Sequence, residues 1–169
     1  MKIIDDFLPS YQFKQLQSVI LGDTFPWYYN DSLAKVDDGK YGFTHAFYCV
    51  DPPWNGKGSP FYSILEPSKN FLYKKLGVKN LHRIKANLNL KTLFHQKTGW
   101  HTDNYKCSTT AILYLNTNNG WTEFKKGGRV KSVENRVVIF DSNLEHAGVT
   151  QTDEKRRVVI NFNYEVCVL

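Results

Sequence analysis

Residues 136–165, RVVIFDSNLEHAGVTQTDEKRRVVINFNYE, decide the fold of this chain. Two runs within this stretch, 136–140 and 157–165, are rich in the β-branched and aromatic residues that strands prefer. A polar segment with the turn residues Asp-Ser-Asn separates them. The stretch therefore predicts two strands of an antiparallel sheet with His146 between them.

The second of these runs has two different faces. Alternate residues of a strand point to opposite sides of the sheet, so one face carries the polar residues Arg157, Asn161 and Asn163. The other face is apolar and consists of Val158, Ile160, Phe162 and Tyr164. We expect the apolar face to pack on helices and the polar face to line a pocket, because buried polar groups without partners are costly.

Further strands are predicted upstream of this stretch. From residue 82 onward, Ile84, Ala86, Leu88 and Leu90 alternate with Arg83, Lys85, Asn87 and Asn89. Additional runs of strand composition lie at 109–116, 120–124 and 129–133, separated by Asn-Asn-Gly and Lys-Gly-Gly turns.

Two helices are predicted in the N-terminal half. Apolar residues recur at helical spacing in 10–21 and again in 67–76, where Gly77 follows as a C-terminal cap. The intervening segment, 24–60, is rich in Pro, Gly, Asp and Trp and reads as irregular structure with short strands. The sequence thus predicts a mainly β fold of the α+β class, an antiparallel sandwich or barrel with N-terminal helices packed on one sheet.

Composition indicates one globular domain over 1–169. The chain has 169 residues, of which 41% are hydrophobic and 15% aromatic, enough to bury a core. It has no apolar run of membrane-spanning length and carries Asp5 and Asp6 early, so we expect a cytoplasmic protein with no membrane partner.

Three cysteines, Cys49, Cys107 and Cys167, suggest partly buried thiols rather than disulfides. The net charge of +6 lacks an accompanying nucleic-acid motif, which argues against a nucleic-acid partner.

Three residues are candidate metal ligands: His101 and Asp103 in GWHTDN, and His146 in SNLEHAG. In an extended segment residues i and i+2 point to the same side, so His101 and Asp103 can reach one ion. Two histidines and one carboxylate form the facial triad of non-heme iron(II) oxygenases. An isolated His-x-Asp pair is weak on its own, and most such pairs lie in ordinary loops.

The order of these motifs resembles a known family. From Arg83 to Tyr164 the chain resembles the double-stranded β-helix core, a jelly roll, of prolyl 4-hydroxylase-like 2-oxoglutarate oxygenases. The matching features are HTD, ILYLN at 112–116, the hydrophobic strand before His146 and an arginine strand after it. The resemblance implies a single oxygenase domain with its core at about 82–169 and a helical and irregular part at about 1–81. It also implies iron(II) and 2-oxoglutarate, with ascorbate as a candidate accessory reductant, for hydroxylating an unactivated C–H bond.

The resemblance further implies residues that bind 2-oxoglutarate. A basic residue on the last core strand holds the distal carboxylate in this family, and here spacing admits either Arg156 or Arg157. The polar face of the strand favours Arg157 and adds Asn161. Tyr114 occupies the position of a tyrosine that donates to the same carboxylate in related hydroxylases. Relatives often carry another tyrosine on the strand before His-x-Asp, where this chain has asparagines.

The substrate is the least constrained feature. A prolyl or other side chain of a protein or peptide is the first expectation, and a free amino acid or small metabolite is the alternative. The segments FPWYYND and DPPWNGKGS are candidates for a lid, and Trp100, Trp121 and Phe124 for walls of the site.

Two rival classes of function are a non-catalytic cupin-like metal-binding module and a zinc hydrolase that uses the same three ligands. His45, His82 and His95 are read as structural or surface residues.

Overall fold

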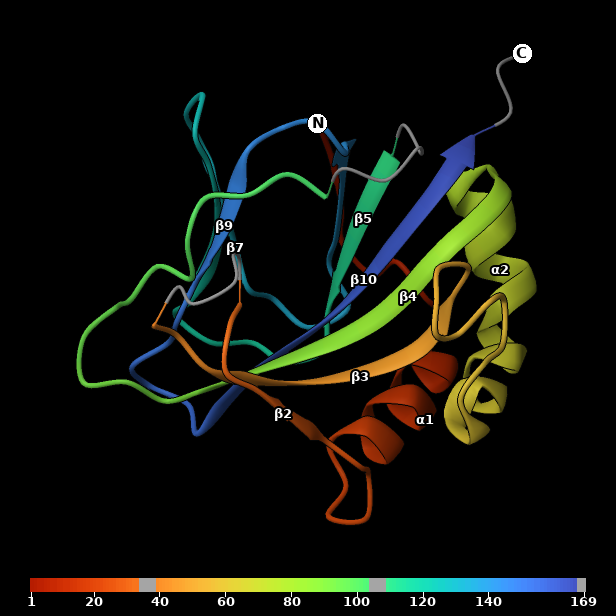
Figure 1. Cartoon of the computed structure of the whole chain (residues 1–169), viewed down its shortest axis with the longest axis horizontal. Coiled ribbons are helices and arrows are strands. Elements are labelled where there is room, and N and C mark those ends of the chain that lie inside the picture. Colours follow the sequence, from red (N-terminus) through yellow and green to blue (C-terminus); the bar gives the residue numbers. More distant parts are fainter. Residues whose placement is uncertain (34–38, 104–108, 167–169) are drawn as a thin grey trace.

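The computed structural model describes residues 1–33, 39–103 and 109–166, which form two antiparallel sheets (Figure 1). Within these residues the larger sheet has the strand order β1-β8-β5-β10-β4-β3-β2 and the smaller sheet the order β7-β6-β9. The strands of the larger sheet are β1 (Lys2–Ile4), β2 (Tyr28–Asn30), β3 (Gly42–Cys49), β4 (Val78–Leu90), β5 (Thr109–Tyr114), β8 (Val137–Asp141) and β10 (Arg156–Val166). Those of the smaller sheet are β6 (Trp121–Phe124), β7 (Arg129–Lys131) and β9 (His146–Val149). This is the predicted mainly β architecture with a jelly-roll core.

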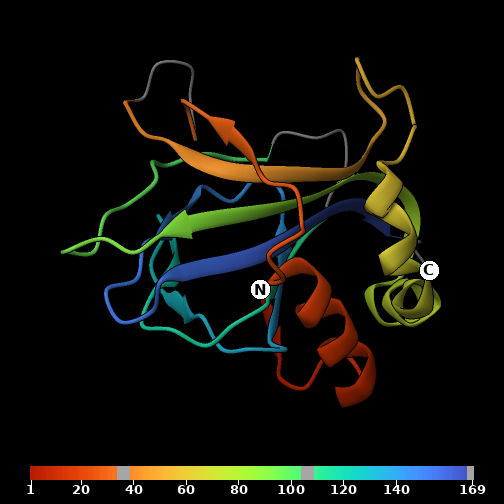
Figure 2. The same ribbon diagram turned by 90° about the horizontal axis from the view of Figure 1, so that it is seen from below.

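The helices cover one face of the larger sheet. α1 (Ser10–Ile20) and α2 (Glu66–Leu76) lie together on this face, with the short 3-10 helix η1 (Pro60–Leu65) leading into α2 (Figure 2). Both helices match their predicted positions, and Gly77 ends α2 in the left-handed conformation with a φ of 64°. No helix in the described part of the chain is long and apolar enough to cross a membrane.

The strand β10 has the predicted phase. Its apolar face, formed by Val158, Ile160, Phe162 and Tyr164, belongs to the main hydrophobic core together with residues of α1 and α2. Its other face points toward the smaller sheet. β10 pairs with β4 on one side and β5 on the other, so Asn161 lies opposite Lys85 and Ile112. The register of this central strand therefore determines which side chains meet between the two sheets.

The N-terminal part departs from its prediction in one respect. The segment expected to be irregular with short strands contains the eight-residue strand β3, which pairs with β4 and extends the larger sheet. Pro, Gly and Asp on both sides of β3 concealed its alternating buried positions in the sequence. His45 on β3 is 2% exposed and hydrogen bonds to Pro26 O and Ser59 Oγ, which confirms its structural role. The short strands β1 and β9 were not predicted.

Cys49 ends β3 as a free, buried thiol, as predicted. Cys107 and Cys167 lie outside the described residues.

A buried asparagine ties the N-terminal segment to the strand region. The Asn135 side chain accepts a hydrogen bond from Leu8 N at 2.9 Å and donates one to Leu8 O at 2.9 Å. The Asn135 backbone has a φ of 58°, a conformation that asparagine and glycine tolerate better than other residues. Asn135 therefore serves both a turn and a long-range contact.

Substitution of Asn135 separates these two roles. We expect Asn135→Gly to lower the free energy of unfolding by about 1–3 kcal/mol, because it leaves the Leu8 backbone groups without partners. Asn135→Ala should cost about 1 kcal/mol more, since alanine is strained at this φ. Urea unfolding measures both, with the exposed Asn143→Ala as a control that changes stability by less than about 0.5 kcal/mol. Equal stability of the Gly and Ala variants would contradict the backbone part of this explanation.

Candidate metal centre

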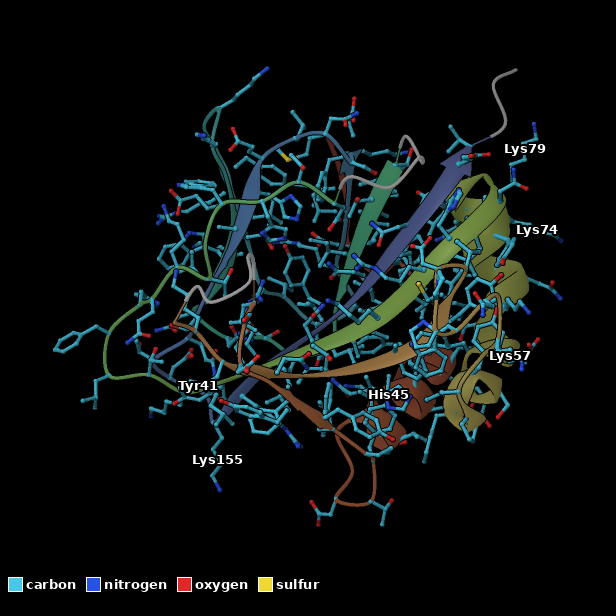
Figure 3. All side chains as sticks on the ribbon, in the orientation of Figure 1. Tyr41, His45, Lys57, Lys74, Lys79 and Lys155 are labelled. Atoms are coloured by element: carbon cyan, nitrogen blue, oxygen red, sulfur yellow. The ribbon has the colours of Figure 1, made fainter. Side chains whose placement is uncertain are left out.

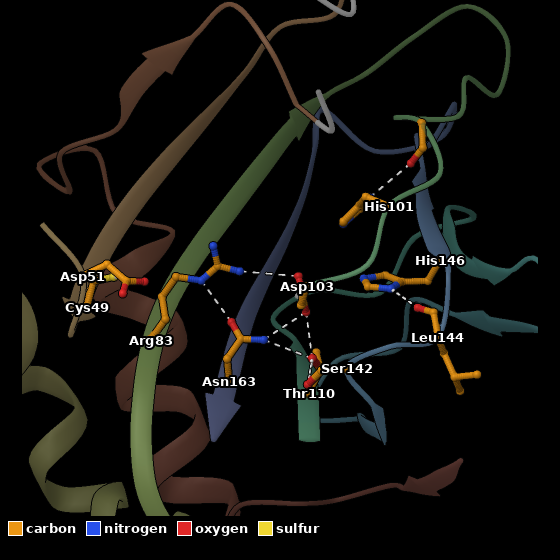
Figure 4. A network of polar contacts seen from close by, with 11 residues as sticks. Cys49, Asp51, Arg83, His101, Asp103, Thr110, Ser142, Leu144, His146 and Asn163 are labelled. Atoms are coloured by element: carbon orange, nitrogen blue, oxygen red, sulfur yellow. Dashed lines mark hydrogen bonds and ion pairs between the residues drawn. The ribbon is translucent and has the colours of Figure 1, made fainter. Parts of the chain in front are cut away.

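The three predicted ligands converge at the edge of the smaller sheet (Figure 4). His146 begins β9, and His101 lies beside it in a bridge with two backbone hydrogen bonds, of 3.1 Å and 2.9 Å. The Asp103 backbone N–H donates to Ser142 O at 3.1 Å, which places this segment next to the end of β8. One potential ligand atom from each of His101, Asp103 and His146 lies within 4.8 Å of the other two.

The state of His146 suits a metal ligand. Its ring is 2% exposed, and Nδ1 lies 3.0 Å from Leu144 O. A carbonyl oxygen can only accept, so Nδ1 carries the proton and Nε2 carries the lone pair. Nε2 is buried and has no hydrogen-bond partner among the described residues. Burial lowers the pKa of His146, although the Asp103 carboxylate opposes this, and the ring stays neutral. An unpartnered buried lone pair beside a carboxylate is the donor set that an iron(II) or similar ion requires.

Asp103 is held by a network of neutral and charged donors. Its Oδ2 accepts from Thr110 Oγ1 at 2.7 Å and from Asn163 Nδ2 at 2.9 Å. Arg83 Nη2 lies 3.4 Å from Oδ1, while Arg83 Nε donates to Asn163 Oδ1 at 3.0 Å. Burial alone raises the pKa of Asp103, but His146, Arg83 and these hydrogen bonds together hold the pKa below its usual value. The carboxylate is therefore ionised and fixed in orientation before any metal binds.

A cavity of about 240 Å³ extends from the triad between the two sheets. Its described lining includes the polar face of β4, part of β10 (Arg157, Val159 and Asn161), Thr122 of β6 and Gly148 of β9. The β4 residues are Arg83, Lys85, Asn87 and Asn89. The metal ligands therefore open into a space with predominantly polar walls.

Arg157 also lines this cavity, as the phase of β10 predicted. It is 3% exposed, and it donates from Nε to Ser132 Oγ at 2.8 Å and from Nη2 to Thr122 Oγ1 at 3.2 Å. No carboxylate forms an ion pair with Arg157 in the described part of the chain. Arg156 points the other way and donates to Leu21 O at the end of α1. A buried guanidinium paired only with hydroxyls is an anion-binding group.

The two other residues predicted to bind 2-oxoglutarate, Asn161 and Tyr114, differ in whether they line the cavity. Asn161 lines the cavity, and its Oδ1 is buried without a partner among the described residues. Tyr114 is fully buried behind the cavity, where its ring lies 5.6 Å from the Arg157 guanidinium carbon and its hydroxyl donates to Thr122 Oγ1 at 2.8 Å. Tyr114 thus reaches the cavity through Thr122.

The aromatic residues proposed as walls do not contribute to the described lining. Phe124 packs against Phe140 and, at 6.2 Å between ring centroids, against His146. The Trp121 ring lies 4.7 Å from the His95 ring in a tilted arrangement, and the Lys97 ammonium lies over Trp100. The two candidate lid segments, 25–31 and 51–59, also supply no described lining residue.

Sequence reasoning missed the roles of Arg83, Lys85 and Asn163. Arg83 and Asn163 orient Asp103, and Lys85 faces the cavity. The signal was present in the alternating polar positions of β4 and β10. It could not be assigned to particular partners, because the pairing of these distant strands is not visible in either segment alone.

The sequence also matches a known protein family in the part that carries this site. The family described as the 2OG-Fe(II) oxygenase superfamily matches residues 88–165, a segment that contains His101, Asp103, His146 and Arg157 in the expected order. This match identifies residues 88–165 as a segment of the 2OG-Fe(II) oxygenase type and supports the predicted 2-oxoglutarate-dependent dioxygenase. A search of curated protein sequences gave no match.

Solved structures of oxygenases share the fold at low sequence identity. A 2OG-Fe(II) oxygenase family oxidoreductase from Burkholderia pseudomallei superposes with a TM-score of 0.71 at 12% identity, covering 96% of this chain and 84% of that one. A prolyl-4-hydroxylase from Pseudomonas putida gives 0.57 at 15% identity, covering 97% and 91%. A prolyl hydroxylase from Trichoplax adhaerens, in complex with a hypoxia inducible factor peptide fragment, gives 0.58 at 13% identity, covering 97% and 83%.

The contacts of Asp103 generate a prediction for the oxygenase. Thr110→Val removes the 2.7 Å hydrogen bond to Asp103 Oδ2 while keeping the shape of the side chain. We expect the affinity for Fe(II) to fall roughly 10- to 100-fold, because a ligating carboxylate loses the partner that orients it. Thr110→Ser keeps the hydroxyl and should retain most of the affinity. Equal affinities of the Val and Ser variants, measured by metal titration under anaerobic conditions, would show that this hydroxyl does not orient the ligand.

Proposed function

We propose that this oxygenase hydroxylates an unactivated C–H bond, with iron(II) held by His101, Asp103 and His146 and 2-oxoglutarate anchored by Arg157. One observation carries the proposal. The triad and the buried Arg157 line the same cavity, and among the described residues His146 Nε2 has no hydrogen-bond partner and Arg157 has no carboxylate partner. An ion and a dicarboxylate that bridges it to an arginine would satisfy both features together.

Each side chain has a distinct task in this proposal. The two imidazoles and the ionised Asp103 present lone pairs in fixed directions, so no large rearrangement precedes metal binding. Arg157 binds the distal carboxylate of 2-oxoglutarate through its guanidinium, and its contacts with Ser132 and Thr122 keep that group in place. The buried Tyr114 hydroxyl supports this end through Thr122, and Asn161 offers its amide further along the co-substrate.

The metal supplies the dioxygen chemistry when it is bound. The net reaction converts 2-oxoglutarate, dioxygen and a C–H bond into succinate, carbon dioxide and a C–OH group. The protein contributes binding, orientation and exclusion of water from the space between the sheets. No side chain of this chain needs to act as nucleophile or general base.

For the substrate, we favour a side chain of a protein or peptide, with proline first. Two structural neighbours are prolyl hydroxylases, one of them bound to a peptide fragment. The cavity of about 240 Å³ is smaller than sites that enclose a drug-sized molecule, which span roughly 300–1,000 Å³. With 2-oxoglutarate inside, room remains for one side chain or for a small molecule of similar size. A free amino acid or small metabolite is the second candidate, because it would occupy the same space.

The two rival functions, a zinc hydrolase and a non-catalytic metal-binding module, explain fewer features of the site. A zinc hydrolase needs only the triad and a water molecule, and it gives no reason for a buried arginine at 3% exposure. A non-catalytic metal-binding module likewise requires no anion site beside the metal. Both rivals predict that 2-oxoglutarate has no effect on the metal.

The first test removes a metal ligand. We expect Asp103→Ala to abolish Fe(II) binding and succinate formation while the protein stays folded, because Asp103 lines the cavity and is not part of the hydrophobic core. The control is Asp153→Ala, which alters an exposed carboxylate bound to Asn119 N. An Asp103→Ala protein with full iron affinity and full turnover would refute the assignment.

The second test compares the two adjacent arginines. Arg157→Ala should weaken 2-oxoglutarate binding roughly 100-fold, since a buried charged partner of a carboxylate is lost. Arg156→Ala should leave that affinity within about 2-fold, because Arg156 faces α1. Binding is measured anaerobically by titrating the iron-loaded protein, and thermal unfolding of both variants checks that they are folded. Equal weakening by the two substitutions would contradict the assigned face of β10.

The substrate class is tested by product analysis. Iron-loaded protein is incubated with 2-oxoglutarate and separate panels of proline-containing peptides and free amino acids. We expect peptides to stimulate succinate formation and to gain the mass of one oxygen atom. Stimulation and oxygen gain with free amino acids alone would replace the peptide hypothesis and leave the oxygenase assignment intact.

A further inference from the structure

The cavity contains more positive charge than the metal and co-substrate require. Three cationic side chains, Arg83, Lys85 and Arg157, line it, whereas Asp103 is the one carboxylate in its described lining. Iron(II) and doubly ionised 2-oxoglutarate carry equal and opposite charges. Among the described lining residues, a loaded cavity would therefore keep an excess of positive charge, concentrated where Arg83 and Lys85 lie on β4.

Two of these three cations already have defined partners. Arg157 contacts Ser132 and Thr122 at the co-substrate end, and Arg83 contacts Asp103 and Asn163. Within the described residues Lys85 forms no ion pair or hydrogen bond through its ammonium group. Of the cations in the described lining, Lys85 is the one that remains available to a ligand.

The surroundings of Lys85 favour an anion. Arg83 lies two residues away on the same face of β4, about 7 Å along the strand, so the two like charges repel each other. Directly across from Lys85 in the sheet are the uncharged Asn161 on β10 and Ala46 on β3. Burial, and then the charge of Arg83, lower the pKa of Lys85 to about 8. A negatively charged ligand would relieve both the burial of this ammonium group and the repulsion.

We propose that Lys85 binds a carboxylate group of the primary substrate, next to the carbon that is hydroxylated. This inference rests on the proposed oxygenase function and narrows its substrate to an acid. Arg83 contacts the metal-ligating carboxylate, so a group bound by its neighbour Lys85 lies on the metal side of the cavity. The carboxylate has two sources, the acidic side chain of a peptide or a free carboxylic acid, and both present the same chemistry to the ammonium group.

The experiment measures binding and does not require turnover. The protein is loaded with Zn(II), as a redox-inert substitute for iron, and with 2-oxoglutarate. Two matched pairs of probes are titrated by ligand-detected NMR. The peptide pair is acetyl-Pro-Asp-amide and acetyl-Pro-Asn-amide, and the free-acid pair is L-proline and L-prolinamide.

In at least one pair we expect the acid to bind roughly 10- to 100-fold more tightly than its amide, the range for a hydrogen bond between charged groups. The pair that shows this preference identifies the source of the carboxylate. Lys85→Met should reduce the acid to the affinity of the amide, and Lys85→Arg should retain the preference. The control is Lys79→Met, the same substitution at an exposed lysine near the start of β4 (Figure 3), which should leave all affinities unchanged.

Three outcomes would overturn the inference. No acid binds more tightly than its amide in either pair, Lys85→Met leaves the preference intact, or Lys85→Met weakens 2-oxoglutarate as much as the probe. The last outcome would assign Lys85 to the co-substrate. Succinate formation by the unaltered iron-loaded protein is measured separately. If it is absent while the acid preference and its dependence on Lys85 hold, the oxygenase proposal fails and the anion site stands.

Discussion

The alternation of side chains along β10 is the constraint on which both fold and site depend. From Arg157 to Tyr164 every residue of this strand is buried, because helices cover one face and the cavity and smaller sheet cover the other. A shift of register by one residue would turn Arg157, Asn161 and Asn163 toward the hydrophobic layer. Burial of these groups without partners would cost several kcal/mol. The same pairing that builds the core thus places the polar groups of the site.

Polar partners on neighbouring strands make this arrangement stable. Asn163 donates to Asp103 and to Thr110, so a residue of β10 holds a metal-ligating carboxylate in place. Arg157 donates to hydroxyls at the opposite end of the cavity. The site is therefore organised by hydrogen bonds that exist before a metal or co-substrate binds, and little reorganisation is needed for binding.

Much of this organisation follows from the sequence. The alternation at 157–165 predicts the strand, its apolar face and which of the two adjacent arginines lies on the polar face, because each conclusion needs only local periodicity. The triad follows from residue type and order. The strand β3 and the partners of Asp103 do not follow in this way. β3 is flanked by turn residues that conceal it, and Arg83 meets Asp103 only through the pairing of strands far apart in the chain. Tyr114 was placed on the correct strand, but its indirect route to the cavity through Thr122 depends on packing.

The two strands β4 and β10 divide the chemistry of the cavity between them. β10 contributes Arg157, the proposed anchor for the co-substrate, and β4 contributes Arg83, which contacts Asp103, and Lys85. Such a division would let a change at Lys85 alter substrate preference without removing a contact of Asp103 or of Arg157. The central claim is that one cavity holds iron at His101, Asp103 and His146 and 2-oxoglutarate at Arg157. A crystal structure grown anaerobically with Fe(II) and 2-oxoglutarate tests it most directly. The account predicts iron bound by those three side chains and the distal carboxylate of 2-oxoglutarate on the Arg157 guanidinium. Iron bound elsewhere, or 2-oxoglutarate absent from Arg157 at full iron occupancy, would contradict it.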